Sequence, residues 1–273
     1  MKCSKCDTPL TEHHAVVRRV ADAAGKQRPL ALYTCPACRA QSEALPSPSE
    51  LRAWALLTKG SSLQAQGRLQ EALSCFESVL SANPNHAMAW YDKACILANL
   101  QRFEEAVAGY ERALALDPSY AEAWHNKGCA LRALGLDAEA LECFNGALHV
   151  DARLEPTWTS KGNLLLARGD SQEAVECYEQ ALALNPDGAQ AWRGKGCALA
   201  QLGRPVEAVN CYDAALRIRP NCTEAWVCKA NALRVLGQVL EALECYERAL
   251  AINPEDKRTQ EYRASLLATL GRA

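Results

Sequence analysis

The sequence predicts a mainly α-helical protein, a solenoid of helix-turn-helix repeats with a small β module at its N-terminus. Two observations lead to this prediction. Residues 53–256 repeat with a period of 34 residues, and residues 1–44 hold two Cys-x2-Cys pairs around a segment with strand character. The composition, 49% hydrophobic and 23% charged, is that of a globular protein rather than a disordered one.

The N-terminal module contains one pair of cysteines near its start, Cys3 and Cys6, and another near its end, Cys35 and Cys38. Between the pairs, HHAVVRRV and PLALY are predicted strands, joined by a turn at ADAAGKQ. A hairpin of this kind would bring the two pairs together. Thiolates two residues apart can share one zinc ion at about 2.3 Å. Metal binding would also supply stability that so small a module cannot obtain from a core.

These paired motifs resemble the zinc-ribbon family. The resemblance implies a structural Zn²⁺ in a closed tetrahedral site formed by the four cysteines, Cys3, Cys6, Cys35 and Cys38. Rubredoxin-like iron is the main alternative, because CPAC resembles one knuckle of that family, although Arg39 stands where a glycine is expected. A thioredoxin-like redox pair is disfavoured, because no βαβ pattern surrounds either motif.

Residues 45–52 are a predicted linker, stiffened by Pro46 and Pro48, and lead into six repeats at 53–256. In this frame position 4 of five repeats is tryptophan: Trp90, Trp124, Trp158, Trp192 and Trp226. Position 24 is always aromatic: Phe76, Tyr110, Phe144, Tyr178, Tyr212 and Tyr246. Position 7 is always lysine, position 8 is Gly or Ala, and position 20 is always alanine. Several slots that recur together at one spacing indicate a repeat architecture.

The spacing within each repeat predicts two helices. Positions 4, 8 and 11 share one helix face, and positions 20, 24 and 27 share another. Small residues at positions 8 and 20 let the helices approach closely, and the aromatic residues fill the space beside them. Glycine at position 15 ends the first helix in a left-handed cap, and proline at position 32 stops the second. A single hairpin cannot bury its apolar face, so stacking of repeats is required.

Segments such as AWHNKGCALRALGLDAEALECFNGAL closely resemble the tetratricopeptide repeat family. The resemblance implies a right-handed superhelical solenoid over 53–256. Position 7 departs from the family, since lysine replaces the usual leucine, and its aliphatic stem can still pack. Residues 257–273 are a predicted capping helix, in which Tyr262, Leu266, Leu267 and Leu270 would cover the last repeat.

The family resemblance also implies a concave groove lined by the first helices, in which peptides commonly lie. Asparagines there could bind a peptide backbone, and arginines could bind carboxylates; the alternative is that both are ordinary solvated positions. The candidate groove residues are Tyr91, Asn99, His125, Arg132, Asn163, Arg193, Asn231 and Arg234. We interpret the cysteines within the repeats as small packing residues, because they recur at positions 9 and 23.

We therefore predict a non-catalytic scaffold or adaptor that binds a protein or peptide partner in the groove. Nucleic-acid binding through Arg18, Arg19, Lys26 and Arg28 is the alternative, although these charges lack interleaved aromatics. The sequence shows no P-loop, nucleophile elbow or metal-hydrolase motif that would indicate an enzyme. It also lacks a signal peptide and a membrane-length apolar run, so we expect a soluble, cytoplasmic protein.

Overall fold

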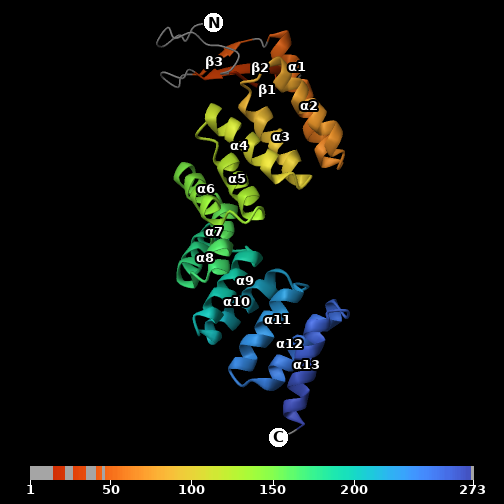
Figure 1. The fold of residues 1–273 in the computed structure, drawn as a ribbon, viewed down its shortest axis with the longest axis vertical. Helices are drawn as coiled ribbons and strands as arrows, with labels where there is room; N and C mark the ends of the chain where they lie inside the picture. Colours follow the sequence, from red (N-terminus) through yellow and green to blue (C-terminus); the bar gives the residue numbers. More distant parts are fainter. Residues whose placement is uncertain (1–14, 22–26, 35–40, 45–46, 272–273) are drawn as a thin grey trace. The chain divides into compact units, whose positions relative to one another are not determined.

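A computed structural model describes residues 15–21, 27–34, 41–44 and 47–271, with side chains described for 47–271. The chain divides into two compact units, residues 1–134 and 135–273. Figure 1 shows a small sheet and helices in the first unit, and helices in the second unit. Within the described ranges, no helix is long and apolar enough to cross a membrane.

The sheet of the first unit has three antiparallel strands in the order β1-β2-β3. The strands are β1 Ala15–Ala21, β2 Gln27–Thr34 and β3 Gln41–Ala44. Ala15 is paired with Tyr33, so the chain enters β1 and leaves β2 at the same end of the hairpin. The first two strands agree with the predicted hairpin, whereas β3 was not predicted.

Five helices complete the first unit: α1 Pro48–Ala65, α2 Leu69–Ala82, α3 Ala87–Asn99, α4 Phe103–Leu116 and α5 Ala121–Ala133. The start of α1 corrects the predicted linker, because residues 48–52 are helical. Ser47 caps this helix: its Oγ accepts from the amide of Glu50 at 3.2 Å, and Glu50 Oε2 accepts from the amide of Ser47 at 2.7 Å. Pro48 at the first helical position suits this start, because its missing N–H would be unpaired there anyway.

The second unit contains eight helices among the residues that the structure describes. They are α6 Asp137–Val150, α7 Glu155–Arg168, α8 Ser171–Leu184, α9 Ala189–Gln201, α10 Pro205–Ile218, α11 Thr223–Val235, α12 Val239–Ile252 and α13 Lys257–Leu270. The pairs α7/α8, α9/α10 and α11/α12 pack as the helical hairpins of three successive repeats. These pairs, together with α1/α2 and α3/α4 in the first unit, confirm the predicted helix-turn-helix pattern.

The core of each hairpin is built on the aromatic residue at position 24. Phe76 and Tyr178 have no exposed surface, and Tyr212 has 2%. Position 8 is small because the ring occupies the space of a side chain. A Cβ placed on Gly60 would lie 2.7 Å from the ring of Phe76, and one on Gly196 would lie 2.6 Å from that of Tyr212. The close approach of the two helices therefore depends on both slots together.

Position 15 ends the first helix in the left-handed conformation, as predicted for the glycines. Gly67, Gly169, Gly203 and Gly237 have φ between 73° and 89°. The second repeat departs from this pattern, because Gln101 adopts φ 60° at the same slot. A side chain with a Cβ is strained in this region, so the turn after α3 carries a local cost that its counterparts lack.

The tryptophans and lysines of the first helices join neighbouring repeats. The Nε1 of each tryptophan at position 4 donates to the carbonyl oxygen six residues earlier, as Trp192 does to Pro186 at 2.9 Å. Each lysine at position 7 from the second repeat onward lies over the tryptophan of its own helix, at 5.7–5.9 Å from the ring centroid. Most also pair with an acid on the preceding helix, as Lys195 Nζ does with Glu179 Oε1 at 2.8 Å. This explains the departure from leucine at position 7.

Helix α13 continues the same lattice. Gln260 stands in the tryptophan slot, and its Nε2 donates to the carbonyl of Pro254 at 2.6 Å. Leu266 is buried as predicted, but Leu267 and Leu270 are 41% and 37% exposed. The expectation that these two leucines cover the last repeat was therefore wrong. The helix packs through the face that carries Tyr262 and Leu266, which turns Leu267 away.

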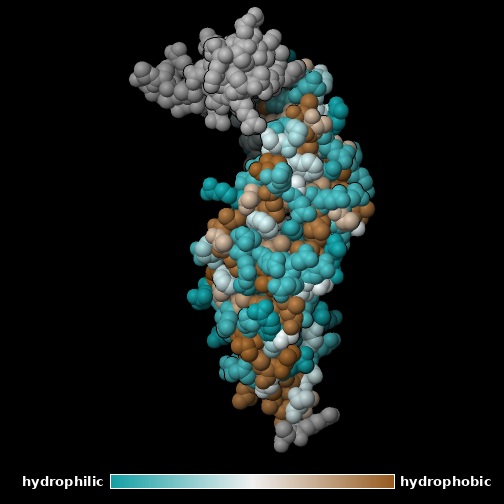
Figure 2. All heavy atoms as spheres, turned by 90° about the vertical axis from the view of Figure 1, so that its left-hand side faces the viewer, coloured by the Kyte–Doolittle hydropathy of each residue, from teal (hydrophilic) through white to brown (hydrophobic). Residues whose placement is uncertain are grey.

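Hydrophilic and hydrophobic side chains both reach solvent on the repeats. Figure 2 shows hydrophilic and hydrophobic residues side by side on the face that it presents. The exposed apolar side chains include Val235 and Leu240, at 70% and 68% exposure. A surface with this mixture offers polar and apolar contacts to a partner.

Candidate functional site

The first helices of neighbouring repeats contact one another within each unit. In the first unit α3 contacts α1 and α5, and in the second unit α9 contacts α7 and α11. We call the solvent-facing side chains of these helices at positions 5, 6, 9, 12 and 13 the first-helix face. All eight predicted groove residues lie on this face. Tyr91, Asn99, His125 and Arg132 belong to the first unit, and Asn163, Arg193, Asn231 and Arg234 belong to the second.

The predicted groove residues differ in how far they reach into solvent. Asn99, Arg132 and Arg234 are exposed. The other five, Tyr91, His125, Asn163, Arg193 and Asn231, are half-buried. A half-buried polar side chain on a helix face can meet a ligand with part of its surface while packing with the rest.

The asparagines at position 9 are tied to the core. The hydroxyl of Tyr178 donates to Oδ1 of Asn163 at 2.8 Å, and that of Tyr246 donates to Oδ1 of Asn231 at 2.7 Å. Each bond pairs the hydroxyl of a buried tyrosine with an amide oxygen on the first helix of its own repeat. The side-chain carbonyl is therefore already used, and the Nδ2 group remains as the donor that could meet a peptide carbonyl.

Position 6, which sequence reasoning did not single out, contacts the preceding repeat. Asn126 Nδ2 donates to Tyr91 Oη at 2.9 Å and lies 3.7 Å from Cys95 Sγ. In the second unit, Cys228 Sγ lies 3.9 Å from Cys197 Sγ. The residue at position 6 differs from repeat to repeat, whereas positions 4, 7 and 8 are nearly constant. This variability was the signal in the sequence that could have identified position 6 as a site of specific contacts.

Gly194 occupies the same slot at the junction of the fourth and fifth repeats. A Cβ on Gly194 would lie 2.5–2.7 Å from the ring and hydroxyl of Tyr178. Glycine is required there because the tyrosine of the preceding repeat fills the space. Position 6 thus decides what the junction between two repeats is made of: an amide, two sulfur atoms, or an aromatic ring.

An aromatic cluster with a half-buried acid occupies the face of the first unit. The ring centroids of Tyr91 and Tyr120 lie 4.6 Å apart, and those of Tyr91 and Tyr110 lie 6.0 Å apart. Asp92 lies beside this cluster, and burial raises the pKa of its carboxyl to about 6. Burial also raises the pKa of Tyr120, and the nearby charges of Asp92 and Glu122 raise it further. This part of the face is aromatic and acidic.

His125 is positioned by its own helix. Its Nε2 lies 3.6 Å from Cys129 Sγ, one turn further along α5. Burial lowers the pKa of the imidazole, and the charge of Arg132 lowers it further. Both effects favour the neutral ring, so His125 offers a hydrogen bond rather than a positive charge.

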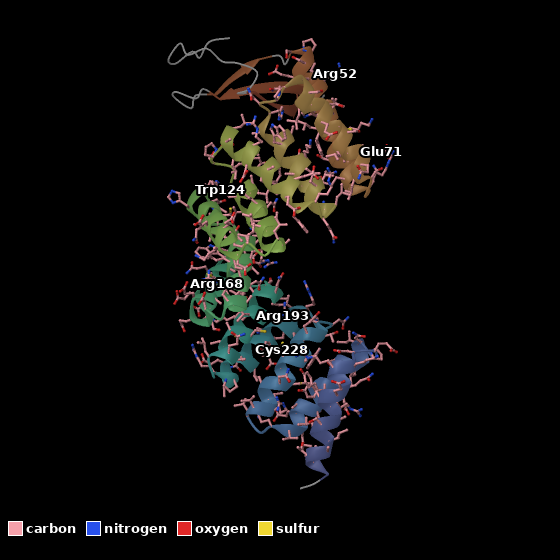
Figure 3. The ribbon with its side chains drawn as sticks, viewed as in Figure 1. Arg52, Glu71, Trp124, Arg168, Arg193 and Cys228 are labelled. Carbon is pink, nitrogen blue, oxygen red and sulfur yellow. The ribbon has the colours of Figure 1, made fainter. Side chains whose placement is uncertain are left out.

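Two arginines, Arg193 and Arg234, lie on the first-helix face of the second unit. Figure 3 labels Arg193 on α9 and Cys228 on α11. The charge of Arg193 favours the ionised form of Glu224, whose pKa is lowered mainly by its backbone hydrogen bond. Burial raises the pKa of Tyr246. Arg234, which is exposed on α11, has a smaller effect in the opposite direction. This face therefore presents positive charge beside the asparagine amides.

The predicted metal ligands Cys3, Cys6, Cys35 and Cys38 lie outside the described residues. Within the part of the chain that is described, no three His, Cys, Asp or Glu side chains come together as a metal site. Of the basic residues considered for nucleic acid, Arg18 and Arg19 lie in β1 and Arg28 in β2, whereas Lys26 lies outside the described ranges. The zinc site and the nucleic-acid alternative stay predictions.

Family comparisons agree with the geometry of the hairpins. Models described as tetratricopeptide repeat match residues 57–108 and 159–221, residues 121–153 and residues 223–256. A model described as TPR repeat matches residues 96–135. Together these matches span most of the chain. The chain belongs to the tetratricopeptide repeat family. Comparison of the sequence with curated proteins gives no significant match.

Solved tetratricopeptide structures share the fold at low sequence identity. YrrB, a TPR protein described with an unusual peptide-binding site, is 23% identical over 69% of this chain and 97% of its own, with a TM-score of 0.60. PilF of Pseudomonas aeruginosa is 19% identical over 80% of this chain and 100% of its own, with a TM-score of 0.71. PilW, a type IV pilus biogenesis factor, is 20% identical over 77% and 97%, with a TM-score of 0.70.

These likenesses establish a mainly α, solenoid-like tetratricopeptide fold. Proteins of this family are generally protein-interaction scaffolds and generally non-catalytic. The right-handed superhelix remains a prediction from the resemblance. Fold alone does not select a partner, so specificity has to come from the side chains on the first-helix face.

Proposed function

We propose that this protein is a non-catalytic scaffold that binds an extended peptide segment of a partner protein on its first-helix face. The observation that supports this is that the positions used for packing and the positions that vary are different ones within each repeat. The constant residues are used for packing, as with the aromatic ring at position 24, while positions 5, 6, 9 and 12 vary and most of their residues, with Thr159 and Gly194 as buried exceptions, remain at least partly exposed. Variable polar side chains on a rigid framework are what peptide recognition requires.

The chemistry of the face suggests which segments would bind. Around Tyr91 and Asp92 the first unit offers aromatic rings and a carboxylate, which suit a lysine or arginine side chain. Arg193 and Arg234 in the second unit suit an acidic side chain or a terminal carboxylate. The likeness to YrrB, described with a peptide-binding site, is consistent with this use of the fold.

Peptides selected from a random library against the full chain would test the proposal. Binding affinity, measured by titration calorimetry, should fall roughly tenfold or more when Arg193 and Arg234 are both changed to Gln, because each lost charge-assisted contact costs about 1.5–3 kcal/mol. Arg248→Gln on α12 is the matched control, since Arg248 is exposed on a second helix.

A corresponding pair of variants probes the first unit. Asp92→Asn should weaken binding of basic peptides, whereas Glu104→Gln, exposed on α4, should leave it unchanged. Equal losses in the first-helix variants and in the two controls would contradict binding on this face. Peptides whose affinity none of the four variants alters would place the binding surface elsewhere.

We also propose that the N-terminal cysteines hold a structural zinc. The spacing of the two Cys-x2-Cys pairs supports this, and so does the register of the hairpin. Because Ala15 is opposite Tyr33, the segments that carry the two pairs adjoin the same end of the β1-β2 hairpin in the sequence. Four thiolates suit Zn²⁺, which would stabilise the small module without taking part in catalysis.

A further inference from the structure

We propose that Cys197 and Cys228 form a site of reversible oxidation, at which a peroxide converts the two thiols into a disulfide that links α9 to α11. The two sulfur atoms lie 3.9 Å apart, on the first helices of consecutive repeats. This inference is independent of the peptide-binding proposal, because it rests on the chemistry of one junction between repeats.

The exposure of the pair separates it from the packing cysteines. The five cysteines at position 23 are buried, as Cys211 and Cys245 illustrate at 5% exposure each. Cys197 and Cys228 are half-buried and reach the first-helix face. A small oxidant can therefore reach their sulfur atoms, whereas the buried cysteines are shielded by the core.

The surroundings of the pair favour one thiolate. The thiol of Cys228 can donate to an ionised Cys197, and the hydroxyl of Tyr212, 3.6 Å from Cys197 Sγ, can do the same. These hydrogen bonds, opposed by burial and helped by the charge of Arg193, lower the pKa of Cys197 to about 6. The hydrogen bond with Cys197 raises the pKa of Cys228. The charge of Arg193 opposes this rise, and Cys222 adds to it. At neutral pH the pair has therefore lost one proton, and the remaining proton is held between the two sulfur atoms.

The junction between the second and third repeats shows what the slot does without a second thiol. Cys95 occupies position 9 of the second repeat, and the hydroxyl of Tyr110 donates to its sulfur at 3.5 Å, as in the Cys197 site. Position 6 of the next repeat is Asn126, whose Nδ2 lies 3.7 Å from Cys95 Sγ. There, burial raises the pKa of the thiol. The two sites differ at position 6, which is Asn126 in one and Cys228 in the other, and at position 5, which is Tyr91 in one and Arg193 in the other. The hydrogen bond with Cys228 is the largest of the effects that lower the pKa of Cys197, so Cys228 contributes most to the difference.

The reaction balances with a peroxide as the oxidant. The Cys197 thiolate attacks one oxygen of the peroxide, the O–O bond breaks, and a sulfenic acid and hydroxide form. The sulfur of Cys228, losing its proton to that hydroxide, then attacks the sulfenic sulfur and expels a second hydroxide, which leaves as water after protonation. Two electrons pass from the two sulfur atoms to the peroxide. Closing the bond to about 2.05 Å brings the sulfur atoms roughly 2 Å closer.

The bond would join two repeats that are otherwise held together by packing. Tetratricopeptide repeats contact mainly their neighbours, so a covalent link between α9 and α11 stabilises one junction specifically. A closed loop between residues 197 and 228 also restricts the unfolded chain. Oxidation should therefore raise the urea midpoint of the second unit, and a thiol reductant should return it to its former value.

Peptide mapping of the full chain after treatment with one equivalent of hydrogen peroxide tests the site. Free thiols are blocked with an alkylating reagent, and fragmentation spectra locate any linked peptides. We expect a link between Cys197 and Cys228, formed before any link that involves Cys211 or Cys245, and lost on reduction. Peroxide-treated protein without this link, or with links spread over many cysteines, would overturn the proposal.

Two variants distinguish the pair from a single reactive cysteine. Cys228→Asn places at position 6 the residue type that Asn126 provides beside Cys95. Alkylation of Cys197 at neutral pH should then slow by at least roughly tenfold, because a smaller fraction of Cys197 is thiolate. Cys95→Ser should change neither the link nor this rate. Undiminished alkylation of Cys197 in Cys228→Asn would show that Cys228 does not activate it and would sink the mechanism.

Discussion

The hydroxyl of Tyr178 donates a hydrogen bond of 2.8 Å to Oδ1 of Asn163, and so connects the core of a repeat to its first-helix face. Tyr178 has no exposed surface, whereas Asn163 is half-buried on α7. The same pairing recurs between Tyr246 and Asn231. In this slot an asparagine that resembles a ligand-binding residue also has a structural role.

A double-mutant cycle on this pair should show a favourable coupling of about 1–3 kcal/mol. Asn163→Ala alone should cost about 1–3 kcal/mol, because it removes the hydrogen bond that the buried hydroxyl of Tyr178 donates to Asn163 Oδ1. Tyr178→Phe should cost less, since Phe76 fills the same slot in the first repeat. In the Tyr178→Phe background the Asn163→Ala change should become nearly neutral. Urea unfolding measures all four free energies, and strictly additive effects would contradict the coupling.

Gln101→Gly should stabilise the protein by about 1 kcal/mol. Gln101 is the non-glycine residue with positive φ in the described ranges, and a Cβ in this conformation costs about 1–2 kcal/mol, offset in part by the entropy that glycine loses on folding. The reverse change, Gly203→Gln, is the matched control and should destabilise by a similar amount. No atom lies within 4 Å of a Cβ placed on Gly203, so a loss there would reflect backbone strain alone.

The raised pKa of Asp92 predicts a pH-dependent cost to stability. Burial raises its pKa from 3.8 to about 6, so between these values the folded chain retains a proton that the unfolded chain has released. Stability from this group therefore falls as pH rises through that window. Asp92→Asn should be more stable than the parent by about 1–3 kcal/mol at about pH 7.5, and the difference should vanish below about pH 4.

Glu104→Gln on α4 provides the control for this titration, because Glu104 is exposed. Its unfolding free energy should follow that of the parent at every pH. Should the advantage of Asp92→Asn stay constant down to low pH, the ionisation of Asp92 would not be its cause.

Removal of the proposed zinc should release four thiols without unfolding the repeats. Purified protein should contain one zinc per chain, and a strong chelator should make Cys3, Cys6, Cys35 and Cys38 reactive to a thiol reagent. The urea transition of the helices should be unchanged. Cys35→Ser should lower the zinc content, while Cys75→Ser, at a buried slot in α2, should not. Iron in place of zinc would favour the rubredoxin-like alternative.

The repeating part of the fold could be predicted from the sequence because each slot reports the same physical environment several times. Position 24 shows this well, since one aromatic ring needs one small partner wherever it occurs. The start of α1 was also readable, because Ser47 and Glu50 form an S-x-x-E capping box, yet two nearby prolines favoured the prediction of a linker. The exposure of Leu267 depended on which face of α13 packs, and several apolar residues competed for that face.

The candidate site was predictable in position and less so in chemistry. The helices that carry the eight candidate residues could be predicted from the repeat, and the role of these residues in binding stays a prediction. The contacts of Cys228, Asn126 and Gly194 were missed, because position 6 does not recur and meets residues of the preceding repeat, 31 places earlier for Cys228 and Asn126 and 16 places earlier for Gly194. Likewise, Asn163 could not be paired with Tyr178 without knowing how the two helices of a hairpin face each other. Such contacts depend on three-dimensional packing rather than on a pattern along the chain.

The indole hydrogen bonds have a practical consequence for following the protein by fluorescence. Five tryptophans share one slot, so their emission reports an average over the repeats. Gln260 makes the same bond to the carbonyl of Pro254 that Trp226 makes to Pro220, at 2.6 Å and 2.8 Å respectively. Glutamine can therefore replace the fluorophore while keeping its hydrogen bond. A set of variants, each with a single tryptophan left in this slot and with Trp54 also replaced, would resolve the opening of the chain one repeat at a time.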